Sequence, residues 1–140
     1  MDLDQALAFA RGRHQGVVVT RRANGRPHLS NIAFALDDQG VARISVTEDR
    51  VKTRNLRRDP TASLYVPGSS FWSYAVLDGT AELSAVARDP SDETVDELVG
   101  IYRAVSGDHP DWDEFRATMV SDHRLVVRLR PDHAYGQLNE

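Results

Sequence analysis

The chain has one lysine, Lys52, and it stands in the most basic segment of the sequence, residues 50 to 60. The other basic residues of this segment are Arg50, Arg54, Arg57 and Arg58. Five positive charges in so short a segment need either an anion or open water around them. The segment therefore predicts a binding site for an anion.

The charge of the whole chain limits what that anion can be. The formal charge is −4, and it becomes −9 when the five positive charges of residues 50 to 58 are set aside. A nucleic-acid binder spreads basic residues over one face and has a high isoelectric point, whereas the value here is about 5.7. We expect a small anionic ligand and no nucleic acid. The alternative is a solvated helix face whose arginines pair with Asp49, Asp59 and other acids.

Several catalytic patterns are absent from the sequence. Without cysteine there can be no disulfide, thiol nucleophile or zinc-thiolate site. The five histidines never fall at the i, i+4 spacing of a helical metal site, so no metal site is expected. No P-loop, dinucleotide fingerprint or nucleophile elbow occurs either. If the protein is an enzyme, a bound cofactor is expected to carry the chemistry.

The length of 140 residues fits a single domain over residues 1–140. No apolar run approaches the roughly 20 residues of a bilayer span, and the acidic start is unlike a secretory signal. We therefore expect a cytoplasmic protein that does not enter the membrane.

Local patterns predict the elements that would position the basic segment. Helical spacing and cap residues predict helices over residues 3–13, 51–58 and 91–107, and another that begins at residue 111. Residue alternation and β-branched runs predict strands over 16–20, 28–36, 41–47, 62–66, 72–83 and 123–129, followed by a tail over 130–136. Residues 72–83 form either one long strand or a pair bent around Asp78 and Gly79. This order favours a mainly β (α+β) domain, a small barrel with peripheral helices.

Four motifs and their order resemble a known family. They are Gly25 to Asn31 on a hairpin, Arg50 to Pro60, Trp72-Ser73-Tyr74 and Gly79-Thr80-Ala81. The chain resembles the pyridoxamine 5′-phosphate oxidase-like split β-barrel superfamily over nearly its full length. Within it, Tyr102, Asp111 to Asp113, Asp122 to Arg124 and His133 to Gly136 resemble the actinobacterial branch that uses the deazaflavin coenzyme F420 instead of FMN.

The resemblance implies a six-stranded antiparallel split β-barrel that forms a homodimer, with two cofactor sites at the subunit interface. Arg50 and Lys52 would hold the cofactor phosphate, with Asn55 and Leu56 close by. By the same resemblance, the residues that face the ring system would be Ser30, Asn31, Val46 and Thr47. The residues that wall the pocket from the partner subunit would be Trp72, Tyr74 and Arg124. For Trp72 and Tyr74 the alternative is barrel core or plain dimer packing.

The resemblance implies an F420-dependent oxidoreductase that transfers a hydride to a small organic acceptor. The closing residues Tyr135 to Glu140 lack the Arg/His-bearing segment of the true pyridoxamine phosphate oxidases, so that reaction is not expected. The catalytic residue stays open, and His28 and Tyr74 are the candidate proton donors. Three alternatives also stay open: an FMN-binding oxidoreductase, a coenzyme-binding protein without catalysis, and a dimeric barrel whose basic segment is only solvated.

Overall fold

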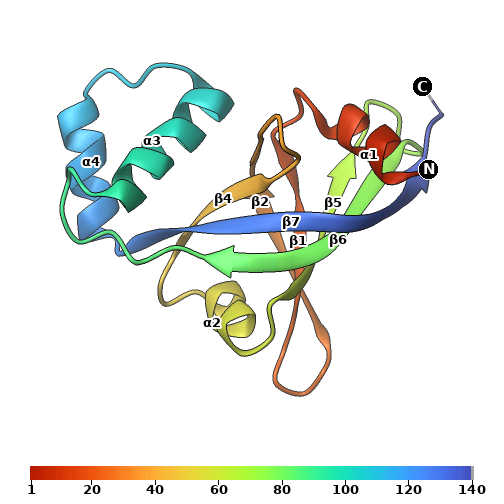
Figure 1. Ribbon diagram of the computed structural model, residues 1–140, viewed down its shortest axis with the longest axis horizontal. Coiled ribbons are helices and arrows are strands. Elements are labelled where there is room, and N and C mark those ends of the chain that lie inside the picture. The colour runs from red at the N-terminus through yellow and green to blue at the C-terminus, as the bar shows by residue number, and fades with distance from the viewer. Residues whose placement is uncertain (140) are drawn as a thin grey trace.

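A computed structural model describes residues 1–139 of the chain. Seven antiparallel strands form one curled sheet in the order β2-β1-β5-β6-β7-β4-β3, and four helices lie around it (Figure 1). The elements are α1 (Leu3–Ala10), β1 (Gln15–Arg21), β2 (Pro27–Ala33), β3 (Ala35–Leu36), β4 (Ala42–Thr47), α2 (Val51–Arg58), β5 (Thr61–Pro67), β6 (Tyr74–Leu83), α3 (Glu93–Ser106), α4 (Trp112–Ser121) and β7 (Arg124–Gln137).

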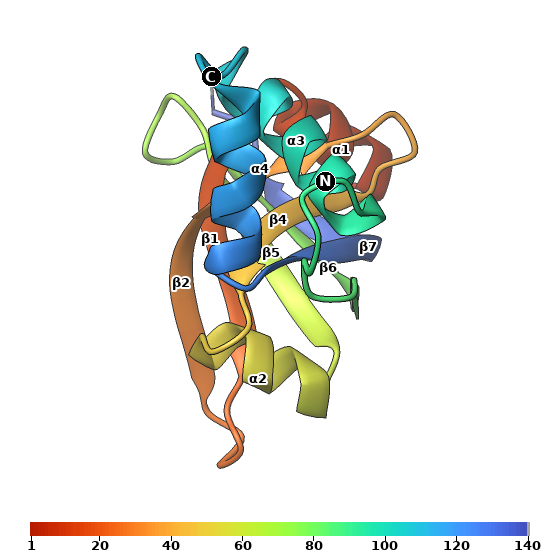
Figure 2. The ribbon, with the colours of Figure 1, turned by 90° about the vertical axis from the view of Figure 1, so that its left-hand side faces the viewer.

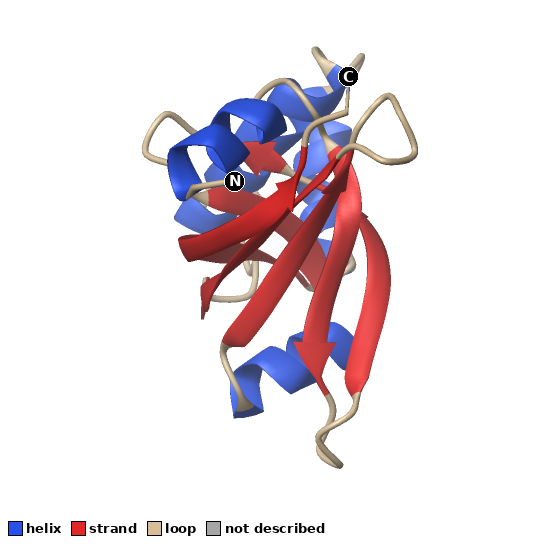
Figure 3. Ribbon diagram, turned by 90° about the vertical axis from the view of Figure 1, so that its right-hand side faces the viewer, coloured by secondary structure: helices blue, strands red, loops and turns tan. Residues whose placement is uncertain are grey.

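The interior of the curled sheet is the main hydrophobic core. Alternate residues of β1 and β5 are buried, for example Val18, Leu64 and Val66, because successive side chains of a strand point to opposite faces. α1 and α2 lie at opposite ends of the sheet (Figure 3). The mainly β architecture predicted from the residue pattern is therefore confirmed.

The predicted number of six strands is wrong, because the segment expected as one strand over 28–36 is divided at Phe34. The Phe34 side chain is fully buried, and its amide donates to the His14 carbonyl at 2.9 Å. Before this residue β2 pairs with β1, and after it the short β3 pairs with β4. The chain thus crosses here from one edge of the sheet to the other.

The predicted tail over residues 130–136 is also wrong, since β7 continues to Gln137 as the partner of the long strand β6. The ladder shifts register between Asp78 and Gly79, where Pro131 lies opposite Gly79. A proline lacks the amide proton that a regular ladder needs, and bulges accommodate it. A Cβ on Gly79 would come within 2.1 Å of the Arg130 carbonyl oxygen, so glycine is required at this contact.

The helices begin close to the predicted positions. α2 spans residues 51–58 as predicted, and Asp92 and Asp111 accept hydrogen bonds from the backbone amides of Val95 and Glu114 at the starts of α3 and α4. These two helices pack together in the connection between β6 and β7 and form a second apolar cluster (Figure 2). Within residues 1–139, none of the helices has the length and apolar character that crossing a bilayer requires.

Candidate functional site

Three cationic side chains gather where α2, β4 and β7 meet. Arg50 is the N-cap residue of α2, Lys52 lies in its first turn, and Arg124 begins β7 opposite Thr47 of β4. These three residues, here called the cationic triad, line a common recess together with Ser45. The β4–β7 ladder thus brings Arg124 to a segment that lies far from it in sequence.

Lys52 is the most unusual member of the triad, because a lysine rarely becomes buried without a counter-charge. Its side chain lies on the barrel side of α2, the residue is only 7% exposed, and its Nζ donates to the Ser30 hydroxyl at 3.1 Å. No carboxylate within residues 1–139 forms a salt bridge with it. Burial lowers the pKa of Lys52, and the positive charges of Arg50 and Arg124 lower it further.

Arg124 also has unused hydrogen-bonding capacity. Its Nη1 donates to the Ser45 hydroxyl at 3.4 Å, whereas its Nε is buried without a hydrogen-bond partner among the described residues. Asp122 forms a long ion pair with Arg124, with 4.0 Å between this Nε and the Asp122 Oδ2. Three cations with spare donors therefore face one recess, and an anion placed there would satisfy the donors and relieve the repulsion between them.

The triad stands at the junction of two cavities. The smaller, of about 120 Å³, is bounded by the triad, Ser45, Val46 and Thr47. The larger, of about 490 Å³, extends from the same three cations between the end of β2 and the helices α3 and α4, and is called the cleft below. A volume of this size is typical of a small-molecule site.

The structure brings together most of the residues predicted at the phosphate and ring positions. Ser30 bonds to Lys52, Asn31 lines the cleft from β2, and Val46 and Thr47 line the smaller cavity. β2 is an edge strand, so part of its backbone faces away from β1 and is free to bind a ligand.

Asn55 and Leu56 lie on α2 but face the barrel. The Asn55 amide donates to the Thr20 hydroxyl at 3.1 Å and accepts a hydrogen bond from Arg58, and Leu56 belongs to the main core. In the single chain these two residues do not line the cleft. Their burial explains why α2 holds its first turn firmly against the sheet.

Trp72 and Tyr74 lie away from the cleft of their own chain. Trp72 is in the loop between β5 and β6, is 64% exposed and packs edge-on against Phe71. Tyr74 begins β6 and stacks on Tyr65 with ring centroids 5.5 Å apart. His28, the other candidate proton donor, has a buried Nδ1 without a partner among the described residues but does not line the cleft.

Sequence reasoning missed the wall of the cleft that α3 and α4 provide. Six apolar or aromatic residues form it: Leu98, Ile101, Tyr102, Val105, Phe115 and Met119. Leu98, Tyr102 and Val105 have the spacing of an apolar helix stripe, but such a stripe does not distinguish a core contact from a cavity wall. Met119 belongs to the second apolar cluster and also lines the cleft.

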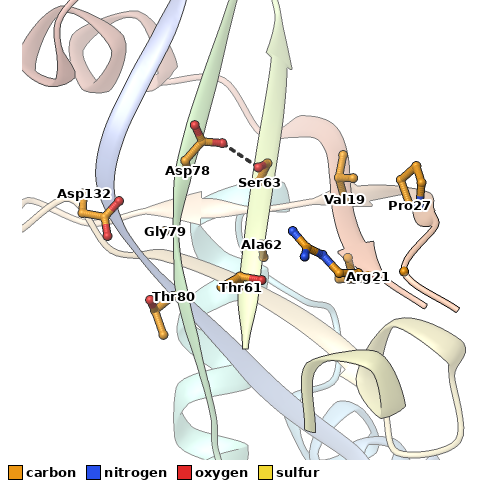
Figure 4. Close-up of a pocket in the computed structure, with 12 residues that line it drawn as sticks. Val19, Arg21, Pro27, Thr61, Ala62, Ser63, Asp78, Gly79, Thr80 and Asp132 are labelled. Carbon is orange, nitrogen blue, oxygen red and sulfur yellow. Dashed lines mark hydrogen bonds between the residues drawn. The ribbon is translucent and has the colours of Figure 1, made fainter. Parts of the chain in front are cut away.

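A further pocket of about 480 Å³ lies on the outer face of the sheet (Figure 4). Its polar residues include Arg21, Asp78 and Asp132, and the Ser63 hydroxyl donates to Asp78 at 2.5 Å. Two carboxylates and one exposed arginine are a poor environment for an anion. Residues 1–139 also contain no cluster of three or more histidine or acidic side chains suited to a metal ion. The cationic triad is therefore the stronger candidate site.

Known structures share this fold. An F420 reductase aligns with a TM-score of 0.67 and 22% sequence identity, over 93% of this chain and 95% of the other. A putative pyridoxamine 5′-phosphate oxidase from Listeria innocua aligns with a TM-score of 0.67 and 20% sequence identity, over 98% of both chains. A heme binding protein from Mycobacterium smegmatis aligns with a TM-score of 0.69 and 22% sequence identity, over 95% of this chain and 52% of the other.

The sequence itself matches a family model. The match to the pyridoxamine 5′-phosphate oxidase model runs from residue 3 to residue 138, which is almost the whole chain. The resemblance inferred from the hairpin, the basic segment and the later motifs is thereby confirmed. Together the family match and the shared fold show that this chain belongs to the pyridoxamine 5′-phosphate oxidase-like family.

Proposed function

We propose that the protein is an oxidoreductase that binds coenzyme F420 through the cationic triad. The observation that carries the proposal is the buried Lys52, which has no counter-charge among residues 1–139 and shares its recess with Arg50 and Arg124. A phosphoryl group supplies the missing negative charge and accepts several hydrogen bonds. The fold shared with an F420 reductase supports F420 as the coenzyme.

The residues of the chain have separate parts in this proposal. The triad binds the phosphate, Ser30 orients the Lys52 ammonium, and the free edge of β2 near Asn31 supplies hydrogen bonds to the polar edge of the ring. When bound, the reduced coenzyme supplies a hydride to a small organic acceptor, which also takes up a proton. The protein holds the two reactants in contact, which by itself lowers the barrier.

We further propose that two copies of the chain assemble through the outer face of the sheet. Large apolar side chains are exposed on this face, among them Leu29 and Tyr135, and the loop between β5 and β6 exposes Phe71 and Trp72. Tyr65 of β5 and Tyr74 of β6 stack on each other. In such a dimer the exposed Trp72 would be available to the cleft of the partner. Sedimentation equilibrium tests this, and a monomer at micromolar concentration contradicts it.

Titration of tryptophan emission with F420 and, separately, with FMN tests the coenzyme. We expect saturable F420 binding, and Lys52→Gln should weaken it by about 10- to 150-fold, the equivalent of about 1.5–3 kcal/mol for one charge-assisted contact. Arg57→Gln is the matched control, because Arg57 is an exposed cation of the same helix that does not line the cleft. Tight FMN binding without F420 binding would contradict the choice of coenzyme, and equal affinities of the two variants would contradict the site.

A further inference from the structure

The helices α3 and α4 form one wall of the cleft and differ from the rest of it in chemistry. They have their own apolar cluster, which joins the sheet through Val126. Tyr102 lies within this helical pair and packs against His109, Trp112 and Phe115. The wall is therefore built from side chains that their neighbours hold in place.

This wall faces the cationic triad across the cleft, so the cavity is apolar on one side and cationic at one end. The only polar side-chain atoms that α3 and α4 add to the lining are the hydroxyls of Tyr102 and Ser106. A polar or charged group pressed against this wall would lose water without gaining hydrogen bonds. Apolar surface would instead be stabilised there by about 25 cal/mol for each Å² buried.

We propose that the α3–α4 wall selects the acceptor, and that the acceptor has an apolar body that packs on Val105, Met119 and their neighbours. This inference rests on the proposed function, because the phosphate and the polar edge of the coenzyme are assigned to the triad and to β2. The part of the cleft that is left for the acceptor is its apolar side, which α3 and α4 form. The side chains of α3 and α4 are then the specificity-determining residues, and the triad has no part in distinguishing acceptors.

The test replaces Val105, a half-buried residue of the wall, with glutamate. The matched control is Ala104→Glu, which adds the same charge at the neighbouring position of α3, where the side chain is exposed and lies outside the cleft. Far-UV circular dichroism and a cooperative thermal transition establish that both variants fold.

The first measurement needs no coenzyme. The fluorescent probe 1-anilinonaphthalene-8-sulfonate combines an apolar ring system with an anionic group and so matches the chemistry of the cleft. We expect saturable binding to the native protein, with an affinity at least about tenfold lower in Val105→Glu and unchanged in Ala104→Glu. Equal affinities in the two variants would overturn the inference.

The second measurement compares turnover of 1,4-naphthoquinone and 1,4-benzoquinone by reduced F420, each quinone accepting a hydride and a proton to give the hydroquinone. The ratio of their kcat/KM values should fall about tenfold in Val105→Glu and stay unchanged in Ala104→Glu. If F420 binds and turns over but this ratio is the same in both variants, the inference fails and the proposed function stands. If the wild-type protein binds the probe at the wall but no F420, the proposed function fails and the wall remains an apolar ligand site.

Discussion

Two charged regions lie on the same face of the β4–β7 ladder and are built in opposite ways. In the first, Arg43 and Arg128 stand directly opposite each other, and Glu97 of α3 accepts hydrogen bonds from both, at 2.8 Å from Arg43 and 2.6–2.7 Å from Arg128. Asp37 and Glu82 complete this network. In the second region, four residues away on each strand, Arg124 lies opposite Thr47 and joins Arg50 and Lys52. Among residues 1–139, no carboxylate approaches this triad as closely as Glu97 approaches Arg43 and Arg128.

The difference shows which region serves the fold and which is available to a ligand. Like charges opposite each other on a ladder repel, and in the first region three carboxylates remove that repulsion and fasten α3 to the sheet. The cationic triad keeps its repulsion: burial is the main cause of the lowered pKa of Lys52, and the charges of Arg50 and Arg124 lower this pKa further. Because Lys52 has no carboxylate partner within residues 1–139, this region retains the capacity to bind an external anion.

The largest effect is expected from breaking the compensated network. Glu97→Gln removes the charge that holds Arg43 and Arg128 together, in a side chain that is only 19% exposed. We expect the free energy of unfolding in urea to fall by about 3 kcal/mol. Glu93→Gln, at an exposed position of the same helix, should change it by less than about 0.5 kcal/mol. A loss of anion affinity in Glu97→Gln instead of stability would contradict the division of roles.

An added anion should stabilise the folded protein by binding to the cationic triad and not to the network around Glu97. Inorganic phosphate at ten times its dissociation constant should raise the free energy of unfolding of the wild-type protein by about 1.4 kcal/mol. Thermal unfolding at constant ionic strength measures this, with sodium chloride in place of phosphate as the reference. Lys52→Gln should remove most of the gain and Arg57→Gln none of it. A gain that persists in Lys52→Gln would show that phosphate binds elsewhere.

Without a ligand, removal of the buried Lys52 ammonium should increase the free energy of unfolding. Lys52→Met keeps much of the length of the side chain and removes a charge that is repelled by Arg50 and Arg124. We expect the unliganded protein to become more stable by about 1 kcal/mol in urea unfolding, even as it loses anion affinity. Destabilisation by a similar amount would mean that the bond from Lys52 to Ser30 outweighs the repulsion.

The smallest effects concern pH, and the two regions should respond at opposite ends of the scale. The hydrogen bonds from Arg128 and Arg43 keep the pKa of Glu97 below its ordinary 4.5 despite burial. Its contribution to stability is therefore present above pH 4.5 and is lost as the pH falls through the lower folded value. Glu97→Gln should remove this part of the acid sensitivity, which chemical unfolding between pH 3 and 6 would measure.

For Lys52 the sign is reversed. Its folded pKa lies below 10.5, so the folded state releases the proton first, and stability increases as the pH rises from the folded value toward 10.5. The difference in unfolding free energy between Lys52→Met and the wild-type protein should shrink over this alkaline range. A difference that does not change with pH would show that the buried charge of Lys52 is not its cause.

Much of the fold could be predicted from local patterns. Asp92 and Asp111 mark helix starts through their own side chains, and the alternation in β1 and β5 gives their inner faces directly. The extension of β7 could not be predicted from local sequence patterns. Residues 130–136 form a strand because β6 extends beside them, and the bulge at Gly79 admits Pro131.

For the candidate site, the sequence by itself determined the basic segment and the helix that carries it, because helix propensity and local charge depend on residues that are adjacent in the sequence. Only the tertiary structure decided that Lys52 is buried while Arg54 and Arg57 stay in water, and that Arg124 and the α3–α4 wall meet it. Burial and the absence of a counter-charge depend on what lies nearby in space. Those neighbours come from β4, β7 and two helices far along the chain, and no spacing within residues 50 to 60 encodes them.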